Sequence, residues 1–589
     1  MVDLKSNPYY LDEEGCKWVE DTISSMTDEE KVGQLFFQLT QSQEEDHLKE
    51  LMEKYHLGGC RYNAAPGKVI QEQNRTLQKY AKIPILIACN TEAGGDGACS
   101  DGTPIGSEVK IAATDNEKYA YALGKMANEE AATLGCNMAF APVCDIVYNW
   151  ENTEIINRAF GNDPQRVAKM SAAYLRGAHT VPGFACAAKH FPGNGQDFRD
   201  AHLSNNVNYF DENEWNATYG MVYKTLFENG LEAIMAGHIM LPRYAKAINP
   251  DLKDKDMMPA TLSREIMTGL LREKMGFNGM VVTDASHMVA MTNRMKRADM
   301  LPLSINAGCD MFLFFNDPEE DYGIMRKAYQ DGIIPEERMR EALTRILGLK
   351  AHMGLHKKEK EKLVPQPEAL DQTLGKDEYK EMQKTISRES ITLVKYKDKE
   401  TLPVKPKRYK RVMIVHIKGA GGPMGEIMRM MGMPGGNNAA ELLKNKLCEK
   451  GFDAFIYESP LETMKKRVEE GEKPSLNLYF AGKHAIADFV KDMDLVITLC
   501  DVQSGRPAFG MSKGGGEIPW YVFELPVIVI GCGQPTMLAD IPQARTYINV
   551  YDAKESTFDA LVEALMKGPG AFKGKDPVDS FCGLFDTHL

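Results

Sequence analysis

An aspartate and a histidine stand two positions apart at Asp200 and His202, a spacing that suits proton transfer. In an extended or turn-like segment, side chains two apart project to the same side, so the carboxylate could hydrogen-bond one imidazole nitrogen. That bond would fix the tautomer, stabilise the imidazolium and leave the other nitrogen to exchange a proton. A plain surface contact in a turn is the alternative interpretation of these two residues.

A single carboxylate, Asp284, ends the apolar run 279–284. At that position an aspartate serves either as a nucleophile or base or as the N-cap of a following helix. Upstream, Arg158 carries a planar guanidinium that could make two bonds to a diol or a carboxylate. Asp163 and Pro164 follow it, a pair that predicts a helix start. Arg158 is therefore the binding candidate of its segment, and Asp163 is interpreted as structural.

Eight short apolar runs in the first 320 residues, each bounded by turn residues, could supply the strands that position these side chains. Segments with helical periodicity lie between most of them, including residues 116–134 and 263–275, and residues 27–30 predict a capping box. This alternation predicts an α/β fold, a (β/α)8 TIM-type barrel, with an open doubly wound sheet as the alternative. The runs cover residues 34–39, 57–62, 83–90, 137–145, 184–191, 233–240, 279–284 and 309–315.

Polar residues gather where several of these runs end, which is where a β/α barrel builds its active site. These residues are Asn90, Glu92, Asp145, Lys189, His190, His238 and Asp284. The densest segment passes from Lys189 and His190 through a Pro-Gly-Asn-Gly loop to Asp200 and His202. Its glycines would let the loop bend over a ligand.

A second domain is expected after about residue 355, where the chain turns rich in Lys, Glu and Pro and loses apolar periodicity. Strand-like runs follow at residues 412–417, 452–458, 495–501, 526–531 and 546–551, with helical stretches such as 439–450 and 558–567 between them. We therefore expect a catalytic barrel over residues 1–355, a linker over 356–385 and an α/β sandwich with a mainly parallel sheet over 386–589.

Bulk properties exclude several classes of protein. A net charge of −13 over 589 residues argues against a nucleic-acid surface. No apolar stretch is long enough to span a bilayer, and the first residues lack a signal-like segment. The twelve cysteines are scattered, and seven of them lie in or beside apolar runs, as in a reduced compartment. We expect a cytoplasmic protein without a cofactor or metal, and the oligomeric state stays open.

Two rival functions rest on other residues. A metal-dependent barrel hydrolase would use His190, His202, His238 and Asp145, but zinc sites prefer closely spaced ligand pairs such as HxH or HExxH, which the sequence lacks. A sugar- or nucleotide-binding second domain would use the loop at residues 419–425, which resembles a phosphate-cradling turn. Its spacing is not GxGxxG, and the glycine-rich residues 512–517 are interpreted as a loop.

Seven segments resemble glycoside hydrolase family 3, in particular its β-N-acetylglucosaminidase branch of the peptidoglycan-recycling type. They are residues 26–35, 141–146, 157–164, 189–193, 200–202, 259–263 and 281–284, and they span most of residues 20–355. Lys-His-Phe-Pro-Gly with a downstream Asp-x-His is specific for this branch. Residues 387–394, followed by Leu402 and Pro403, also look like the entry to the αβα sandwich of longer members.

The resemblance implies a retaining hydrolase that removes terminal, non-reducing β-linked N-acetylhexosamine (GlcNAc) from an oligosaccharide or cell-wall fragment. Asp284 would be the nucleophile, and His202, backed by Asp200, would be the acid and base. The residues expected to bind the substrate are Lys189, His190, Arg158, Asp145, Asn90, Glu92 and His238. A neutral histidine would repel an anionic acceptor less than a carboxylate does. A β-N-acetylglucosaminide phosphorylase therefore stays an alternative, as does a β-glucosidase on the same scaffold.

The sequence departs from the family pattern at three positions. The loop that usually reads Pro-Gly-His-Gly-Asp here has Asn194 and Gln196. Asn90 stands where the family usually has an aspartate that grips the sugar, so we expect an uncharged hydrogen bond there. These departures put the exact sugar in question more than the reaction class.

Overall fold

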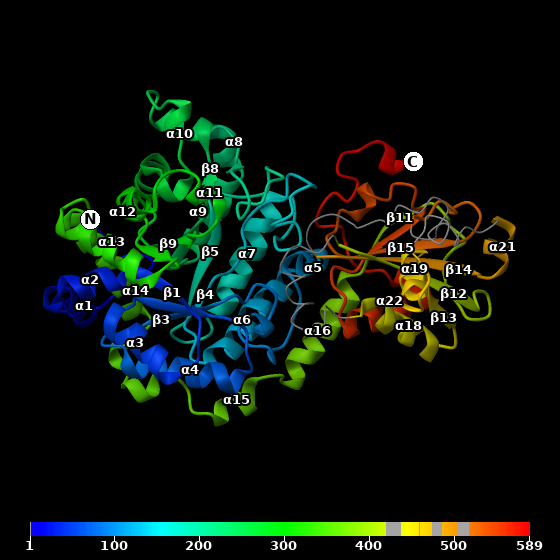
Figure 1. Ribbon diagram of the computed structural model, residues 1–589, viewed down its shortest axis with the longest axis horizontal. Coiled ribbons are helices and arrows are strands. Elements are labelled where there is room, and N and C mark those ends of the chain that lie inside the picture. The colour runs from blue at the N-terminus through cyan, green and yellow to red at the C-terminus, as the bar shows by residue number, and fades with distance from the viewer. Residues whose placement is uncertain (1, 420–437, 459, 474–485, 504–517) are drawn as a thin grey trace. The chain divides into compact units, whose positions relative to one another are not determined.

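The structure is a computed structural model that describes residues 2–419, 438–458, 460–473, 486–503 and 518–589. The chain divides into two compact units (Figure 1). The first comprises Met1–Glu108 with Asn116–Met382, and the second comprises Val109–Asp115 with Gln383–Leu589. Residues 420–425 and 512–517, which the sequence marked as loops of the second domain, lie outside the described residues.

The first unit is built on a closed barrel of eight parallel strands in the order β1-β10-β9-β7-β5-β4-β3-β2. This confirms the predicted barrel over the open sheet. The strands are almost wholly buried, as expected for a parallel sheet covered by helices. They are β1 (Phe36–Thr40), β2 (Gly59–Tyr62), β3 (Leu86–Cys89), β4 (Met138–Ala139), β5 (Ala185–Phe191), β7 (Ala233–Ala236), β9 (Met280–Ala285) and β10 (Met311–Leu313).

Helices separate the barrel strands, and several begin where the sequence predicts. Thr27 and Glu30 form the capping box of α2, and Asp163 caps α7 with Pro164 at its start. The expected helix over residues 263–275 forms with π-helical bonding at Glu265–Lys274. The helices are α1 (Glu13–Ser25), α2 (Asp28–Gln34), α3 (Glu45–Tyr55), α4 (Gly67–Tyr80), α6 (Glu117–Thr133), α7 (Pro164–Ala178), α8 (Glu212–Ala217), α9 (Tyr219–Glu228), α10 (Pro242–Ile248), α11 (Val289–Thr292), α12 (Arg297–Ala307), α13 (Pro318–Gln330) and α14 (Glu336–His352).

The segment after α14 packs against the barrel unit before it reaches the second unit. Arg75 donates hydrogen bonds to the carbonyl oxygens of Val364 at 3.4 Å and Pro365 at 2.8 Å. The backbone N–H of Gly375 donates to Glu130 at 2.8 Å. The helices of this stretch are α15 (Glu368–Thr373) and α16 (Asp377–Ser390).

The second unit holds a six-stranded sheet in the order β11-β16-β15-β14-β12-β13. Its five predicted strands are parallel, and β11, which the apolar pattern did not mark, pairs antiparallel with β16. The strands are β11 (Thr392–Tyr396), β12 (Arg411–Lys418), β13 (Asp453–Ile456), β14 (Leu495–Val502), β15 (Val527–Gly533) and β16 (Thr546–Asn549). The helices are α5 (Glu108–Ala113), α18 (Ala439–Glu449), α19 (Pro460–Glu469), α21 (Ile486–Lys491) and α22 (Glu555–Lys567).

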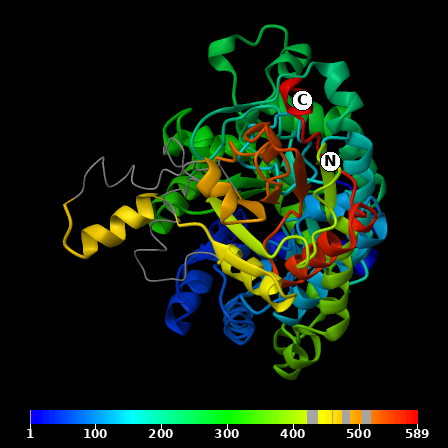
Figure 2. The ribbon, with the colours of Figure 1, turned by 90° about the vertical axis from the view of Figure 1, so that its right-hand side faces the viewer.

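Alternate residues of these strands enter two separate apolar cores, one on each face of the sheet. Figure 1 and Figure 2 show the ribbon of this sheet from two directions. Val412 and Ile414 of β12 pack with α18 and α22 on one face. Met413 and Val415 pack with Phe489 of α21 on the other face. Because successive side chains of a strand point to opposite faces, this unit forms the expected αβα sandwich. None of the helices in the described part of the chain has the length and apolarity needed to cross a bilayer.

Candidate active site

The polar residues at the strand ends form connected groups at the carboxyl end of the barrel. One group joins Glu92, Arg158 and Lys189. Glu92 accepts two bonds of 2.9 Å from Nε and Nη2 of Arg158 and also pairs with the Lys189 ammonium. Burial by itself would raise the pKa of Glu92, but the two cations outweigh it and hold the pKa well below its ordinary value. Glu92 is thus an ionised brace that fixes the directions of Arg158 and Lys189.

A second group joins Asp145 to His190. The Asp145 side chain is 0% exposed, and its Oδ2 lies 2.7 Å from His190 Nδ1. Its Oδ1 accepts from the backbone N–H groups of His190 at 3.2 Å and Asn194 at 2.7 Å. With its oxygens committed in this way, Asp145 can orient the His190 ring but cannot itself reach a ligand. The other ring nitrogen of His190, Nε2, lies 4.0 Å from Oδ2 of Asp284.

Asp284 ends β9 with its side chain 14% exposed, and its Oδ1 accepts from the N–H of Ala285 at 2.7 Å. Burial favours its neutral form, but the neighbouring His190, then His238 and the N–H of Ala285 act in the opposite direction and prevail, so the pKa of Asp284 lies below its ordinary value. The residue is therefore an ionised carboxylate at neutral pH, the form that can act as a nucleophile.

His238 lies behind Asp284, and both of its ring nitrogens have partners. Nε2 is 3.0 Å from the carbonyl oxygen of Ala285, and Nδ1 is 2.8 Å from Thr261 Oγ1. A carbonyl can only accept, so Nε2 carries the proton and Nδ1 accepts from the hydroxyl. Burial also lowers the pKa of His238 and favours this neutral ring. His238 thus holds the end of β9 and is not placed to bind a sugar directly.

The Asp200–His202 pair lies in the loop that follows β5. His202 Nδ1 is 2.8 Å from Asp200 Oδ1, and the backbone N–H of His202 donates to the same oxygen at 2.8 Å. This bond is the main reason that the pKa of His202 is raised. The imidazole is 50% exposed, so Nε2 can meet a ligand. The geometry is the one inferred from the spacing of the two residues.

The loop that carries His202 is attached to the segment that follows Asp284. The N–H of Val289 donates to the carbonyl oxygen of His202 at 3.3 Å, and the N–H of Ala290 donates to that of Ala201 at 3.1 Å. Asp284 contributes to the raised pKa of His202, and His202 contributes to the lowered pKa of Asp284. The dyad and the strand-end carboxylate therefore lie near each other at the carboxyl end of the barrel.

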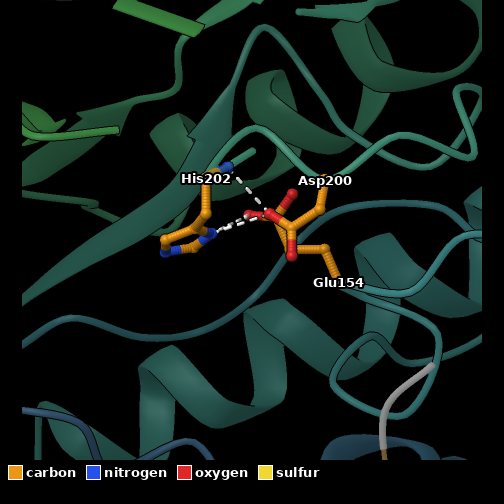
Figure 3. A group of neighbouring side chains, drawn as sticks. All are labelled: Glu154, Asp200 and His202. Atoms are coloured by element: carbon orange, nitrogen blue, oxygen red, sulfur yellow. Dashed lines mark hydrogen bonds and ion pairs between the residues drawn. The ribbon is translucent and has the colours of Figure 1, made fainter. Parts of the chain in front are cut away.

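Glu154 joins this site although sequence analysis did not select it. Figure 3 shows the Glu154 carboxylate beside the Asp200 carboxylate and the His202 ring. Ligand-type atoms of the three residues lie within 4.8 Å of one another. Among the described residues, these three form the group of carboxylates and histidines whose ligand atoms lie close enough to share a metal ion. The set expected for a metal-dependent hydrolase is a different one, namely His190, His202, His238 and Asp145. Glu154 carries no local motif in the sequence, so only its position near Arg158 could have drawn attention to it.

The three departures from the family pattern lie in the same region. The backbone N–H of Asn90, just after β3, donates to Gly97 at 3.2 Å, and its side chain is half-buried. The Asn194 amide donates to Glu154 at 2.9 Å and its oxygen accepts from Asn206 at 3.1 Å. Gln196 accepts from the N–H of Tyr209 at 2.7 Å. Asn194 and Gln196 thus hold the loop to its neighbours.

A parallel β/α barrel whose strand-end loops combine an ionised aspartate, a carboxylate-bound histidine and a fixed pair of cations has the architecture of a carbohydrate-cleaving barrel enzyme. Comparison with known proteins agrees, because residues 27–349 match the family described as "Glycosyl hydrolase family 3 N terminal domain". The chain belongs to glycoside hydrolase family 3.

Individual proteins of known name show how similar the chain is to particular members of the family. The chain is 35% identical to the "Beta-N-acetylglucosaminidase/beta-glucosidase" of Cellulomonas fimi over 592 residues, covering 100% of both proteins. It is 32% identical over 249 residues to a "Beta-hexosaminidase" of Vibrio cholerae, covering 42% of this chain and 70% of the relative. Among solved structures, "Beta-glucoside phosphorylase BglX" matches with a TM-score of 0.88 and 35% identity over 99% of each chain.

Proposed function

We propose that this family 3 glycosidase removes terminal β-linked N-acetylglucosamine with retention of configuration. Asp284 is the nucleophile, and His202, braced by Asp200, is the acid and base. The observation that carries the proposal is an ionised carboxylate at the end of β9 that shares one site with a carboxylate-bound imidazole. The lowered pKa of Asp284 and the raised pKa of His202 suit these two roles.

The first chemical step forms a bond between Asp284 and the anomeric carbon. As the carboxylate attacks, protonated His202 gives its Nε2 proton to the glycosidic oxygen, the carbon–oxygen bond breaks and the aglycone leaves as an alcohol. In the second step neutral His202 takes a proton from water, whose oxygen attacks the same carbon and releases Asp284. Two inversions at one carbon retain its configuration.

The sugar would be held by Arg158, Lys189 and His190, whose donor groups are fixed in direction by the carboxylates behind them. Glu92 and Asp145 act through these residues. An ordered donor array of this kind loses little side-chain freedom on binding. We propose that Asn90, at the end of β3, contributes an uncharged hydrogen bond to the same sugar.

Phosphorolysis is a second candidate reaction, favoured by similarity to a protein named as a β-glucoside phosphorylase over 99% of both chains. In that reaction phosphate, rather than water, attacks the glycosyl–Asp284 ester, and the product is a sugar 1-phosphate. The approach of phosphate is opposed by negative charge near the anomeric carbon. A histidine as the acid and base, in place of a carboxylic acid, reduces this repulsion. The name of the Cellulomonas relative likewise makes β-glucosides a second substrate to test.

One assay separates these alternatives. p-Nitrophenyl β-N-acetylglucosaminide and β-glucoside would be turned over with and without inorganic phosphate, and the products read by 31P NMR. We expect aglycone release, with Asp284→Asn almost inactive and the exposed control Asp299→Asn at the wild-type rate. A sugar 1-phosphate would select phosphorolysis. Normal turnover by Asp284→Asn would refute the assignment.

The cytoplasm is the proposed compartment. All twelve cysteines lie in the described ranges and are free thiols, most of them buried. Such use of cysteine suits a reducing environment. Fractionation of the source cells, with activity measured in each fraction, tests this proposal.

A further inference from the structure

Glu154 is a buried carboxyl group that the proposed chemistry does not use. Its side chain is 5% exposed, and it lies in the loop between β4 and α7. Burying a carboxyl group is costly unless its oxygens are bonded, and both oxygens of Glu154 point to the loop that carries the dyad (Figure 3).

The contacts of Glu154 tie the two ends of that loop together. One oxygen, Oε2, accepts from Asn194 Nδ2 at 2.9 Å and from the N–H of Ala201 at 3.4 Å. The other oxygen, Oε1, lies 4.0 Å from His202 Nδ1. The chain between these contacts contains Asp200. Glu154 therefore connects the two ends of residues 194–201, and its hydrogen bonds to Asn194 and Ala201 are called the clasp below.

The clasp continues to the sugar-binding side of the site through Asn194. The backbone N–H of Asn194 donates to Asp145 Oδ1 at 2.7 Å, and Asp145 holds the ring of His190. A single path of hydrogen bonds thus runs from His190 to the loop of His202. Such connected networks fix side-chain directions more strictly than separate pairs do.

Charge adds to this arrangement. The carboxylates of Asp200, Glu154 and Asp284 each raise the pKa of His202 and so favour the imidazolium. The nearby His287 is also affected, because His202 contributes to lowering the pKa of His287. Burial raises the pKa of Glu154, and His190 works in the opposite direction. Removal of the Glu154 carboxylate would lower the proton affinity of His202.

We infer that Glu154 is a positioning residue, which clasps the loop of His202 through Asn194 and Ala201 and so aims the imidazole at the glycosidic oxygen. This inference rests on the proposed function, in which His202 is the general acid. It does not require Glu154 to touch the substrate.

The inference predicts a dependence on the leaving group. A poor leaving group such as phenol needs a proton from His202 as the bond breaks, whereas 2,4-dinitrophenolate leaves without one. The ratio kcat/KM reports the step that forms the glycosyl ester, so it isolates this proton transfer. Loss of the clasp should slow phenyl β-N-acetylglucosaminide and spare the dinitrophenyl substrate.

The experiment compares Glu154→Ala and Glu154→Gln with the control Glu151→Gln, the same substitution three residues away on an exposed side chain. For Glu154→Ala we expect kcat/KM on the phenyl glycoside to fall about 10- to 100-fold, part of the range that general acid catalysis supplies. On the dinitrophenyl glycoside we expect a change of at most about threefold, since no proton is needed. For Glu154→Gln, which keeps the volume and one acceptor, we expect a smaller loss. We also expect the basic limb of the pH profile to move to lower pH.

Each other outcome has a definite meaning. An equal fall on both substrates, or no fall on either, would overturn the inference. If Glu154→Ala does not fold, as judged by circular dichroism, Asn194→Ala removes the same contact from the opposite side and should give the same leaving-group dependence. His202→Ala separates the two hypotheses: if it too treats both substrates alike, the proposed acid fails, whereas if only the Glu154 variants do, the clasp alone fails.

Discussion

Lys350 of α14 offers the sharpest test of the electrostatics of the barrel. The residue is 0% exposed and its Nζ donates to Gln34 Oε1 at 2.7 Å. Burial lowers the pKa of Lys350 from 10.5 to about 7. The lysine is a cost to the fold because the unfolded chain binds its proton far more tightly than the folded one does.

The size of that cost follows from the two pKa values. At about 1.4 kcal/mol for each pH unit, the interval from 10.5 to about 7 corresponds to about 5 kcal/mol. Lys350→Met removes this cost but leaves Gln34 Oε1 without its donor, a loss of about 1–3 kcal/mol. We expect a net gain of about 2–4 kcal/mol in the free energy of unfolding near pH 7.

The sign of the pH dependence is also defined. Below about pH 7 both states of wild type hold the proton, so the full cost is present, and it disappears as the pH rises toward 10.5. Calorimetry of the barrel transition should therefore show Lys350→Met melting several degrees above wild type at pH 7, with a difference that shrinks by pH 10. The exposed control Lys358→Met should have the same melting temperature as wild type at both pH values. A lower melting temperature at pH 7, or a difference independent of pH, would refute the reasoning.

Three further outcomes are expected. Asp200→Asn should lower the pKa of His202 and shift the basic limb of kcat/KM to lower pH, measured on the phenyl glycoside; an unmoved limb would show that the bond does not set this pKa. Asp310→Asn should destabilise the barrel by about 3–5 kcal/mol in denaturant unfolding, because it leaves the buried Arg345 and the largely buried Arg272 and Arg338 without their shared carboxylate; a loss under about 1 kcal/mol would count against this. Gly195→Ala should lower activity and stability together, because φ is +117° and a Cβ would lie 1.9 Å from Ile146 O; wild-type values would contradict it.

The barrel strands and the central strands of the second sheet could be predicted because they are buried on both faces and read as continuous apolar runs. The two edge strands of the second sheet, β11 and β13, are only partly buried. The run 452–458 still marked β13, whereas Thr392–Tyr396 includes polar residues and was missed. Contacts between residues close in the sequence could also be predicted. Asp200 and His202 are two residues apart, and their hydrogen bond depends little on the rest of the fold.

The sequence by itself therefore determined the barrel, the sandwich and the family, since periodicity and short motifs carry that information. The tertiary structure decided which side chains face a ligand. Glu92 and Arg158 are 66 residues apart, and Asp145 and His190 are 45 apart, so only folding showed that the two carboxylates hold other side chains. Glu154, with no motif of its own, gained its place in the site because the loops of β4 and β5 meet at the carboxyl end of the barrel.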